Sequence, residues 1–169
     1  MNQEQLWAPW RLAYIKDAVK EGAGTEPRPE CFLCHYLEQQ SDRDAGNLVV
    51  RRGPHSVTVL NRYPYNNGHL LIAPRQHVSG LEQMDDATHL EIMHEIQRMI
   101  ALLSDRLNAD GFNCGLNLGQ IAGAGLPGHL HWHVVPRWSG DTNFMPVLAN
   151  IKVIPQSLAA LHEILTEPA

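Results

Sequence analysis

Three histidines recur at every second position near the carboxyl end of the chain, at His129, His131 and His133. Alternate side chains of an extended strand project from one face, so a strand here would bring the three imidazoles together, about 6.5–7 Å apart. Neutral imidazole binds transition metals, and it can also attack phosphorus while neighbouring groups orient it and bind the phosphate. The spacing leaves both chemistries open, beside the plainer interpretation of scattered structural histidines.

A glycine-rich segment, residues 119–128, directly precedes these histidines. It has few side chains and many exposed N–H groups, and such a loop can approach a phosphate closely and bind it. Residues 123–128 match the pattern G-x-G-x-x-G. The dinucleotide fingerprint must follow a strand and open a helix, whereas this segment contains Pro127 and leads into the histidines. The dinucleotide interpretation is therefore rejected.

Cys31 and Cys34 form a C-x-x-C pair, and the third cysteine, Cys114, stands alone in a short apolar segment. Three cysteines do not form a disulfide framework. The pair itself is ambiguous: a thioredoxin-like redox role needs a βαβ context that is missing here, and a zinc site needs two further ligands. Cys114 is expected in the core.

The composition excludes several classes of protein. The chain has 169 residues, of which 44% are hydrophobic, and its formal charge is 13 − 18 = −5. A single domain with a sizeable core fits this length, and the acidic balance argues against electrostatically driven nucleic-acid binding. No apolar run approaches the ~18–20 residues that span a bilayer, and the first residues lack the features of a signal peptide. We therefore expect a soluble cytoplasmic protein without nucleic-acid or membrane partners.

The elements that must position these residues follow from apolar periodicity and turn residues. Strand patterns alternate with Gly, Pro and Asn turns, and one segment has a helical stripe of apolar residues. The predicted strands span residues 48–51, 56–60, 69–73, 112–118 and 130–135. The predicted helices span residues 85–107 and 156–166, and a short helix is predicted after Cys34, to about residue 40. Residues 41–46 are predicted to be a loop. Hairpins with one long helix indicate an α+β fold with a mainly antiparallel sheet.

Three parts of the chain are distinguished by composition. Residues 1–30 are rich in aromatic residues and then in Gly and Pro, which suggests an N-terminal arm that packs on the domain or on a second subunit. Residues 31–150 hold the predicted domain. Residues 151–169 are predicted to be a C-terminal tail whose helix packs on that domain.

At this point the sequence resembles the histidine triad (HIT) family, whose signature is His-x-His-x-His followed by apolar residues. The histidine segment and residues 134–137 match that signature, and residues 60–74 resemble the family's nucleotide-binding hairpin. Residues 7–11 and 138–146 resemble a bacterial branch that includes diadenosine polyphosphate hydrolases and phosphorylases. The resemblance covers roughly residues 7–150. It implies a HIT-like fold with one long helix and short flanking helices, and a homodimer.

The resemblance also implies an enzyme: a nucleotidyl hydrolase or transferase that acts on dinucleoside polyphosphates or related nucleotides through a covalent nucleotidyl-histidine. His131 would attack the α-phosphorus, and His133 would contact the phosphate oxygens and the leaving group. Asn61 matches a position that binds ribose hydroxyls. Asn117 and N–H groups of the glycine-rich loop, such as that of Gly125, would hold phosphate. No organic cofactor is implied.

Relatives with an N-terminal cysteine pair bind zinc through two additional histidines. By this resemblance, Cys31, Cys34, His77 and His129 would surround a structural zinc ion, which would leave the other two histidines of the triad for chemistry. Two alternatives remain open from the sequence. One is a regulatory nucleotide-binding module with weak hydrolysis, and the other is a metal-dependent hydrolase that uses the triad as ligands.

Other polar residues have plainer interpretations. His69 is expected to pack within the hairpin, His162 fits a solvated helix face, and Tyr65 fits packing within a turn. Arg137 either holds a phosphate or forms a surface ion pair.

Overall fold

The computed structural model describes residues 31–143, 145 and 153–168. The chain divides into two compact units, of which the larger comprises residues 30–141 and 154–169. Nearly all of the other unit, including the predicted N-terminal arm, lies outside the described residues. The larger unit is described below. The proposed domain limits at residues 31 and 150 stay a prediction.

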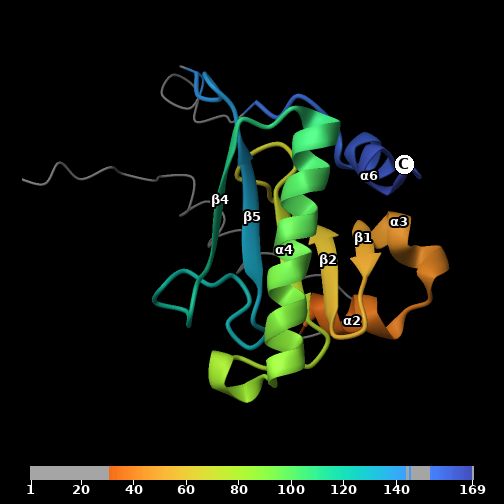
Figure 1. Cartoon of the computed structure of the whole chain (residues 1–169), viewed down its shortest axis with the longest axis vertical. Coiled ribbons are helices and arrows are strands. Elements are labelled where there is room, and N and C mark those ends of the chain that lie inside the picture. Colours follow the sequence, from red (N-terminus) through yellow and green to blue (C-terminus); the bar gives the residue numbers. More distant parts are fainter. Residues whose placement is uncertain (1–30, 144, 146–152, 169) are drawn as a thin grey trace, which may run out of the picture. The chain divides into compact units, whose positions relative to one another are not determined.

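Five antiparallel strands form one sheet in the order β1-β2-β3-β5-β4 (Figure 1). They are β1 (Val49–Arg52), β2 (Ser56–Leu60), β3 (Leu70–Pro74), β4 (Gly111–Leu116) and β5 (Trp132–Arg137). The first three form a meander, and β5 then pairs with β3 and carries β4 on its other edge. The predicted α+β architecture with a mainly antiparallel sheet is confirmed.

One long helix, α4 (Asp86–Leu107), packs against β3 and β5 (Figure 1). The Asp85 carboxylate caps its start by accepting a 2.8 Å hydrogen bond from the main-chain N–H of Thr88. The helix ends at Asn108, whose positive φ of 50° is a left-handed conformation that asparagine tolerates. The predicted long helix is thus confirmed. No helix within the described ranges is both long and apolar enough to cross a bilayer.

Two apolar clusters cover the two faces of the sheet. The cluster under α4 includes Ile72, Trp132 and Val134, and it also takes up Leu161 from the C-terminal helix α6 (Leu158–Thr166). The opposite cluster includes Leu71 of β3 and residues of the short helix α2 (Phe32–Glu38). Leu71 pairs directly with His133 across β3 and β5, so this histidine lies on the face of α2.

Two local predictions were wrong. Residues 41–46, predicted to be a loop, contain a 3-10 turn η2 (Ser41–Arg43) and most of the helical turn α3 (Asp44–Asn47). The reason is tertiary, because the side chain of Asp44 is anchored to β1 by a 2.7 Å ion pair with Arg52. The segment has no apolar stripe of its own.

Strand β5 begins two residues later than predicted and continues through Pro136, so of the three alternating histidines only His133 lies in it. The main-chain N–H of Leu130 bonds instead to the carbonyl oxygen of Val78, outside the sheet. Pro136 is tolerated because its carbonyl oxygen accepts a bond from the Asn66 side chain, on the side where β3 no longer pairs with β5. The missing N–H of proline therefore costs no bond between strands.

Candidate functional site

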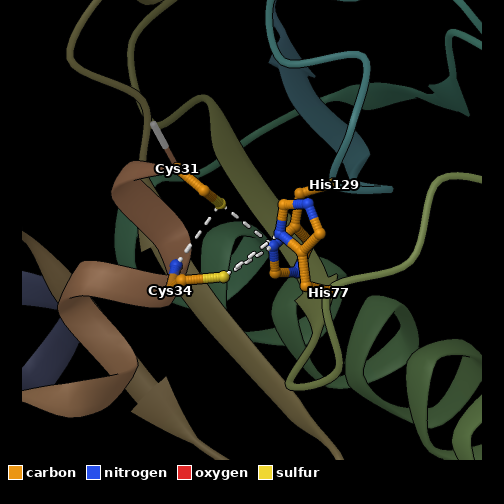
Figure 2. A group of neighbouring side chains, drawn as sticks. All are labelled: Cys31, Cys34, His77 and His129. Atoms are coloured by element: carbon orange, nitrogen blue, oxygen red, sulfur yellow. Dashed lines mark hydrogen bonds between the residues drawn. The ribbon is translucent and has the colours of Figure 1, made fainter. Parts of the chain in front are cut away.

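A cluster of two thiols and two imidazoles lies where α2 meets the segment before β5 (Figure 2). Cys31 caps the start of α2, Cys34 lies one turn later, His77 follows β3 and His129 precedes β5. The four candidate ligand atoms lie within 4.8 Å of one another. The fold therefore brings together the four residues predicted as metal ligands, from segments as far as 98 positions apart.

Distances within the cluster are short. The Sγ atom of Cys31 lies 3.2 Å from Nδ1 of His129, and the Sγ atom of Cys34 lies 3.2 Å from Nδ1 of His77 and 3.5 Å from Nδ1 of His129. Burial, and then the neighbouring Cys31 thiol, raise the pKa of Cys34 to about 11. The cluster is thus a possible metal-binding group of cysteines and histidines.

The protonation of His129 follows from its second nitrogen. Nε2 lies 2.8 Å from the main-chain oxygen of Pro74, which only accepts, so Nε2 carries the proton and donates. Nδ1 therefore keeps its lone pair, and this lone pair faces the thiols. Metal-binding histidines are oriented in this way, by donating their other N–H to a protein acceptor.

His131 has the opposite tautomer. Its Nδ1 lies 2.8 Å from the main-chain oxygen of His129, so Nδ1 carries the proton and Nε2 keeps the lone pair. The side chain is buried, and burial lowers its pKa, which keeps the imidazole neutral near pH 7. A neutral imidazole with a free lone pair is a nucleophile or a general base.

The protonation of His133 follows from a chain of hydrogen bonds. The main-chain N–H of Tyr65 donates to Nδ1 of His69 at 3.0 Å, so His69 carries its proton on Nε2. That Nε2–H donates to Nδ1 of His133 at 2.9 Å, which leaves the proton of neutral His133 on Nε2. Burial, and then His131, lower the pKa of His133 to about 4, so the ring is neutral at pH 7.

The resulting Nε2–H of His133 is a buried donor with no hydrogen-bond partner among the described residues. A buried donor left unpaired costs about 1–3 kcal/mol, and such groups mark functional sites. The rings of His131 and His133 lie edge to face with centroids 5.1 Å apart. A lone pair on one ring thus lies beside a free donor on the next, which suits attack on an anionic electrophile.

The predicted nucleotide-binding residues lie in two places. Asn61 is beside the histidines, with Nδ2 at 3.2 Å from Nδ1 of His69. Asn117 follows β4, and its side chain bonds across the glycine-rich loop to the carbonyl oxygen of Gly123. Gly125 is exposed in the same loop. The structure ties Asn61 to the histidine chain and Asn117 to the loop.

His69 is the residue of this site that sequence reasoning missed. It was expected only to pack in the hairpin, yet it is fully buried and bonded to His133. The available signal was weak: a single histidine immediately before a buried strand. The sequence does not show that β3 pairs with β5, and without this pairing His69 could not be identified as the partner of His133.

Three further residues are now located. Cys114, expected in the core, is exposed, because it lies on β4, which among the described residues is an edge strand of the sheet. His162, expected on a solvated face, is buried and donates a 2.8 Å bond to the main-chain oxygen of Val49. Arg137 forms an ion pair with Asp141, in agreement with the simpler of its two interpretations.

Comparison with known proteins adds to this geometry. The HIT domain family model matches residues 43–140. The AP-4-A phosphorylase of Mycobacterium tuberculosis is 42% identical over 163 residues, which cover 96% of this chain and 82% of that protein.

Two solved structures share the fold. A zinc-bound histidine triad family protein from Mycobacterium smegmatis aligns with a TM-score of 0.62 at 23% identity, covering 80% of this chain and 90% of that one. The Plasmodium falciparum diadenosine triphosphate hydrolase aligns with a TM-score of 0.58 at 18% identity, covering 70% and 74%. At these identities the two structures support the fold alone.

Proposed function

This chain belongs to the HIT domain family, and we propose on that premise that it is a nucleotidyl hydrolase or transferase acting on dinucleoside polyphosphates. The relative named AP-4-A phosphorylase matches over nearly the whole chain and supports this substrate class. It also makes inorganic phosphate the first acceptor to test beside water.

One observation carries the proposal: opposite tautomers on adjacent imidazoles. His131 has its lone pair on Nε2 because its Nδ1–H donates to the oxygen of His129, and His133 has an unpaired Nε2–H. A nucleophile beside a fixed donor is the minimum needed to attack phosphorus and to stabilise the charge that develops on its oxygens.

The reaction then has two displacements. Nε2 of His131 attacks the α-phosphorus, the bond from phosphorus to the leaving phosphate oxygen breaks, and the leaving nucleotide takes the electron pair. Nε2–H of His133 hydrogen-bonds a phosphate oxygen or the leaving oxygen. Water or phosphate next attacks the same phosphorus, the P–N bond breaks, and its electrons return to His131. When water attacks, its proton is released to solvent. The Nδ1 proton of His131 stays on Nδ1, hydrogen-bonded to the carbonyl oxygen of His129, throughout.

Substrate contacts are assigned to three further residues. Asn61, beside His69, would bind the ribose hydroxyls, and Asn117 with the N–H of Gly125 would hold phosphate oxygens. Main-chain N–H groups of a glycine-rich loop suit this task because they carry partial positive charge and little bulk.

Zinc is the metal we assign to Cys31, Cys34, His77 and His129. Structural zinc takes four ligands in a tetrahedron with Zn–S near 2.3 Å and Zn–N near 2.0–2.1 Å, which corresponds to neighbouring S and N atoms about 3.6 Å apart. The three separations in the cluster, 3.2, 3.2 and 3.5 Å, are close to that value. When bound, the ion would supply a structural cross-link between α2 and the segment that leads into β5.

Dimerisation and location complete the proposal. Asn113 and Cys114 are exposed on β4, an edge strand of the described sheet, and such an edge can pair with a second copy. Leu90 and Met93 on α4 are exposed apolar residues that a homodimer could bury. The three described cysteines are free thiols, which is typical of a reducing, cytoplasmic setting.

Product analysis with diadenosine tetraphosphate, with and without inorganic phosphate, tests the function. Wild type should release ATP plus AMP if water is the acceptor, or ATP plus ADP only when phosphate is present. His131→Asn should give neither product, and quenching wild type in alkali, where a P–N bond survives, should trap a nucleotidyl adduct. His162→Asn, which alters a buried histidine outside the site, is the matched control. Equal turnover in wild type and His131→Asn would overturn the proposal.

A further inference from the structure

Tyr65 lies in the connection between β2 and β3, and its ring lies over the paired imidazoles. Its centroid is 4.7 Å from that of His69 and 5.7 Å from that of His133, with interplanar angles of 34° and 24°. The residue is 47% exposed. It therefore covers the His69–His133 pair from the solvent side, although turn packing was all that its sequence context indicated.

The same residue also acts through its main chain. Its N–H donates to Nδ1 of His69. This bond, with the Asn61 amide nitrogen 3.2 Å from the same atom, determines which nitrogen of His69, and then of His133, carries the proton. One residue thus provides both the donor that begins the chain and the ring that restricts rotation of the imidazoles at its end.

The connection that carries Tyr65 is held firmly. The buried side chain of Asn66 donates to the carbonyl oxygen of Pro136 and to the Asp141 carboxylate, both at 2.9 Å. Gly68 has a φ of +74°, and a Cβ there would approach Leu107 to 2.9 Å, so the turn depends on glycine. These contacts of the neighbouring residues therefore fix the position of Tyr65, although its side chain is partly exposed.

We propose that Tyr65 is a positioning residue for the reaction: its N–H and its ring hold the His69–His133 pair so that His133 presents a fixed Nε2–H to the reacting phosphate. The proposal rests on the proposed function for its effect on rate. Its structural content, a single tautomer and orientation of His133, is independent of that function. A His133 ring turned over would carry Nδ1 away from His69 and lose the bond that keeps the proton on Nε2, so an anionic phosphate would meet no fixed donor.

Replacing the ring alone separates positioning from packing. Tyr65→Ala keeps the main-chain N–H and removes the cover, so kcat for diadenosine tetraphosphate should fall about 10- to 30-fold, with KM changed by less than about threefold. Tyr65→Phe should restore wild-type kcat, because the ring and not the hydroxyl lies over the imidazoles. Tyr63→Ala, from the same connection, is the matched control.

Imidazole ¹⁵N spectra give a readout that a merely structural role would not move. In wild type and Tyr65→Phe, His133 should show one protonated Nε2 and one unprotonated Nδ1, whereas in Tyr65→Ala both signals should shift toward tautomer-averaged values. Unchanged spectra in Tyr65→Ala would overturn the proposal, and so would a loss confined to KM. If wild type does not turn over the substrate, the proposed function fails, and the spectra still decide on Tyr65.

Discussion

The two ends of the histidine segment differ in what lies opposite each ring. His129 donates one N–H to the carbonyl oxygen of Pro74 and turns a lone pair toward two thiols. His133 accepts from His69 and turns an unpaired N–H into the site. Both side chains are largely buried and belong to the same short run of alternating histidines. The neighbour that engages one nitrogen therefore decides whether the other nitrogen suits a metal ion or a phosphate.

The middle histidine links the two ends. The Nδ1–H of His131 donates to the main-chain oxygen of His129, and the ring of His131 packs against that of His133. Whatever fixes His129 also fixes the acceptor that orients His131. His129, which faces the thiols, thus orients His131 through one carbonyl group. The comparison can be tested by substituting residues beside His129 and residues beside His133 separately.

The largest effects are expected from substitutions of His131 and His129. His131→Asn should lower kcat by about 10⁴-fold or more while the metal content stays at the wild-type value, because only the nucleophile is lost. His129→Asn should lose metal and stability together. Elemental analysis with steady-state kinetics checks both variants. Metal loss in His131→Asn would contradict the division between the ends.

Next in size is the loss of one thiol. Cys34→Ser should lower the free energy of unfolding by at least about 3 kcal/mol and reduce bound zinc from about one ion to near zero per chain, since structural zinc binding contributes directly to folding. Cys114→Ser, at an exposed position on β4, is the control and should change neither quantity. Denaturant titration and elemental analysis measure both. A stable, zinc-free wild type would end the metal assignment.

Removing the Nε2–H donor of His133 should lower the reaction rate more than the stability of the fold. His133→Asn should lower kcat for diadenosine tetraphosphate about 10²- to 10³-fold, the usual cost of losing one donor to a developing oxyanion. Zinc content should be unchanged. If KM rose with kcat unchanged, His133 would bind substrate without acting in the transition state.

Acid should also distinguish the ends. His133 has a pKa of about 4 in the native state against about 6.5 when unfolded, so between these values the unfolded chain binds more protons. Stability should therefore fall as pH drops from 6.5 toward 4, with a slope of up to about 1.4 kcal/mol per pH unit from this group. His69, His131 and Tyr65 face the ring.

The difference between wild type and His133→Asn isolates this contribution, because the metal ligands are the same in both proteins. Chemical denaturation from pH 5 to pH 7, with saturating zinc, should show the shallower dependence in the variant. Parallel curves for the two proteins would rule out His133 as the titrating group.

The smallest effect is expected at Arg137, outside both ends. Its guanidinium holds the pKa of Asp141 at about 2 through a hydrogen-bonded ion pair. In Arg137→Ala the pKa of Asp141 should rise toward its usual value, while stability changes by less than about 1 kcal/mol and turnover by less than threefold. Carboxyl ¹³C titration checks the shift. A tenfold loss of turnover would instead assign Arg137 to phosphate binding.

Much of the fold could be predicted from local pattern. The apolar stripe predicted α4, and turn residues between β-branched runs predicted β1, β2 and β3. Predictions failed where tertiary contacts decide the outcome. The helical turn at Asp44 depends on Arg52, and the late start of β5 depends on Val78. Exposure of Cys114 depends on β4 being an edge.

The sequence by itself determined which groups are available for chemistry: three alternating histidines, a C-x-x-C pair and a glycine-rich loop, together with the strands and the helix that carry them. Only the tertiary structure decided how these groups are protonated and paired. Cys31 meets His129 across 98 positions, and His69 meets His133 across 64. Such pairings follow from strand order and register, which short-range periodicity does not encode, and the tautomer of each imidazole follows in turn from the acceptor or donor that the fold brings to it.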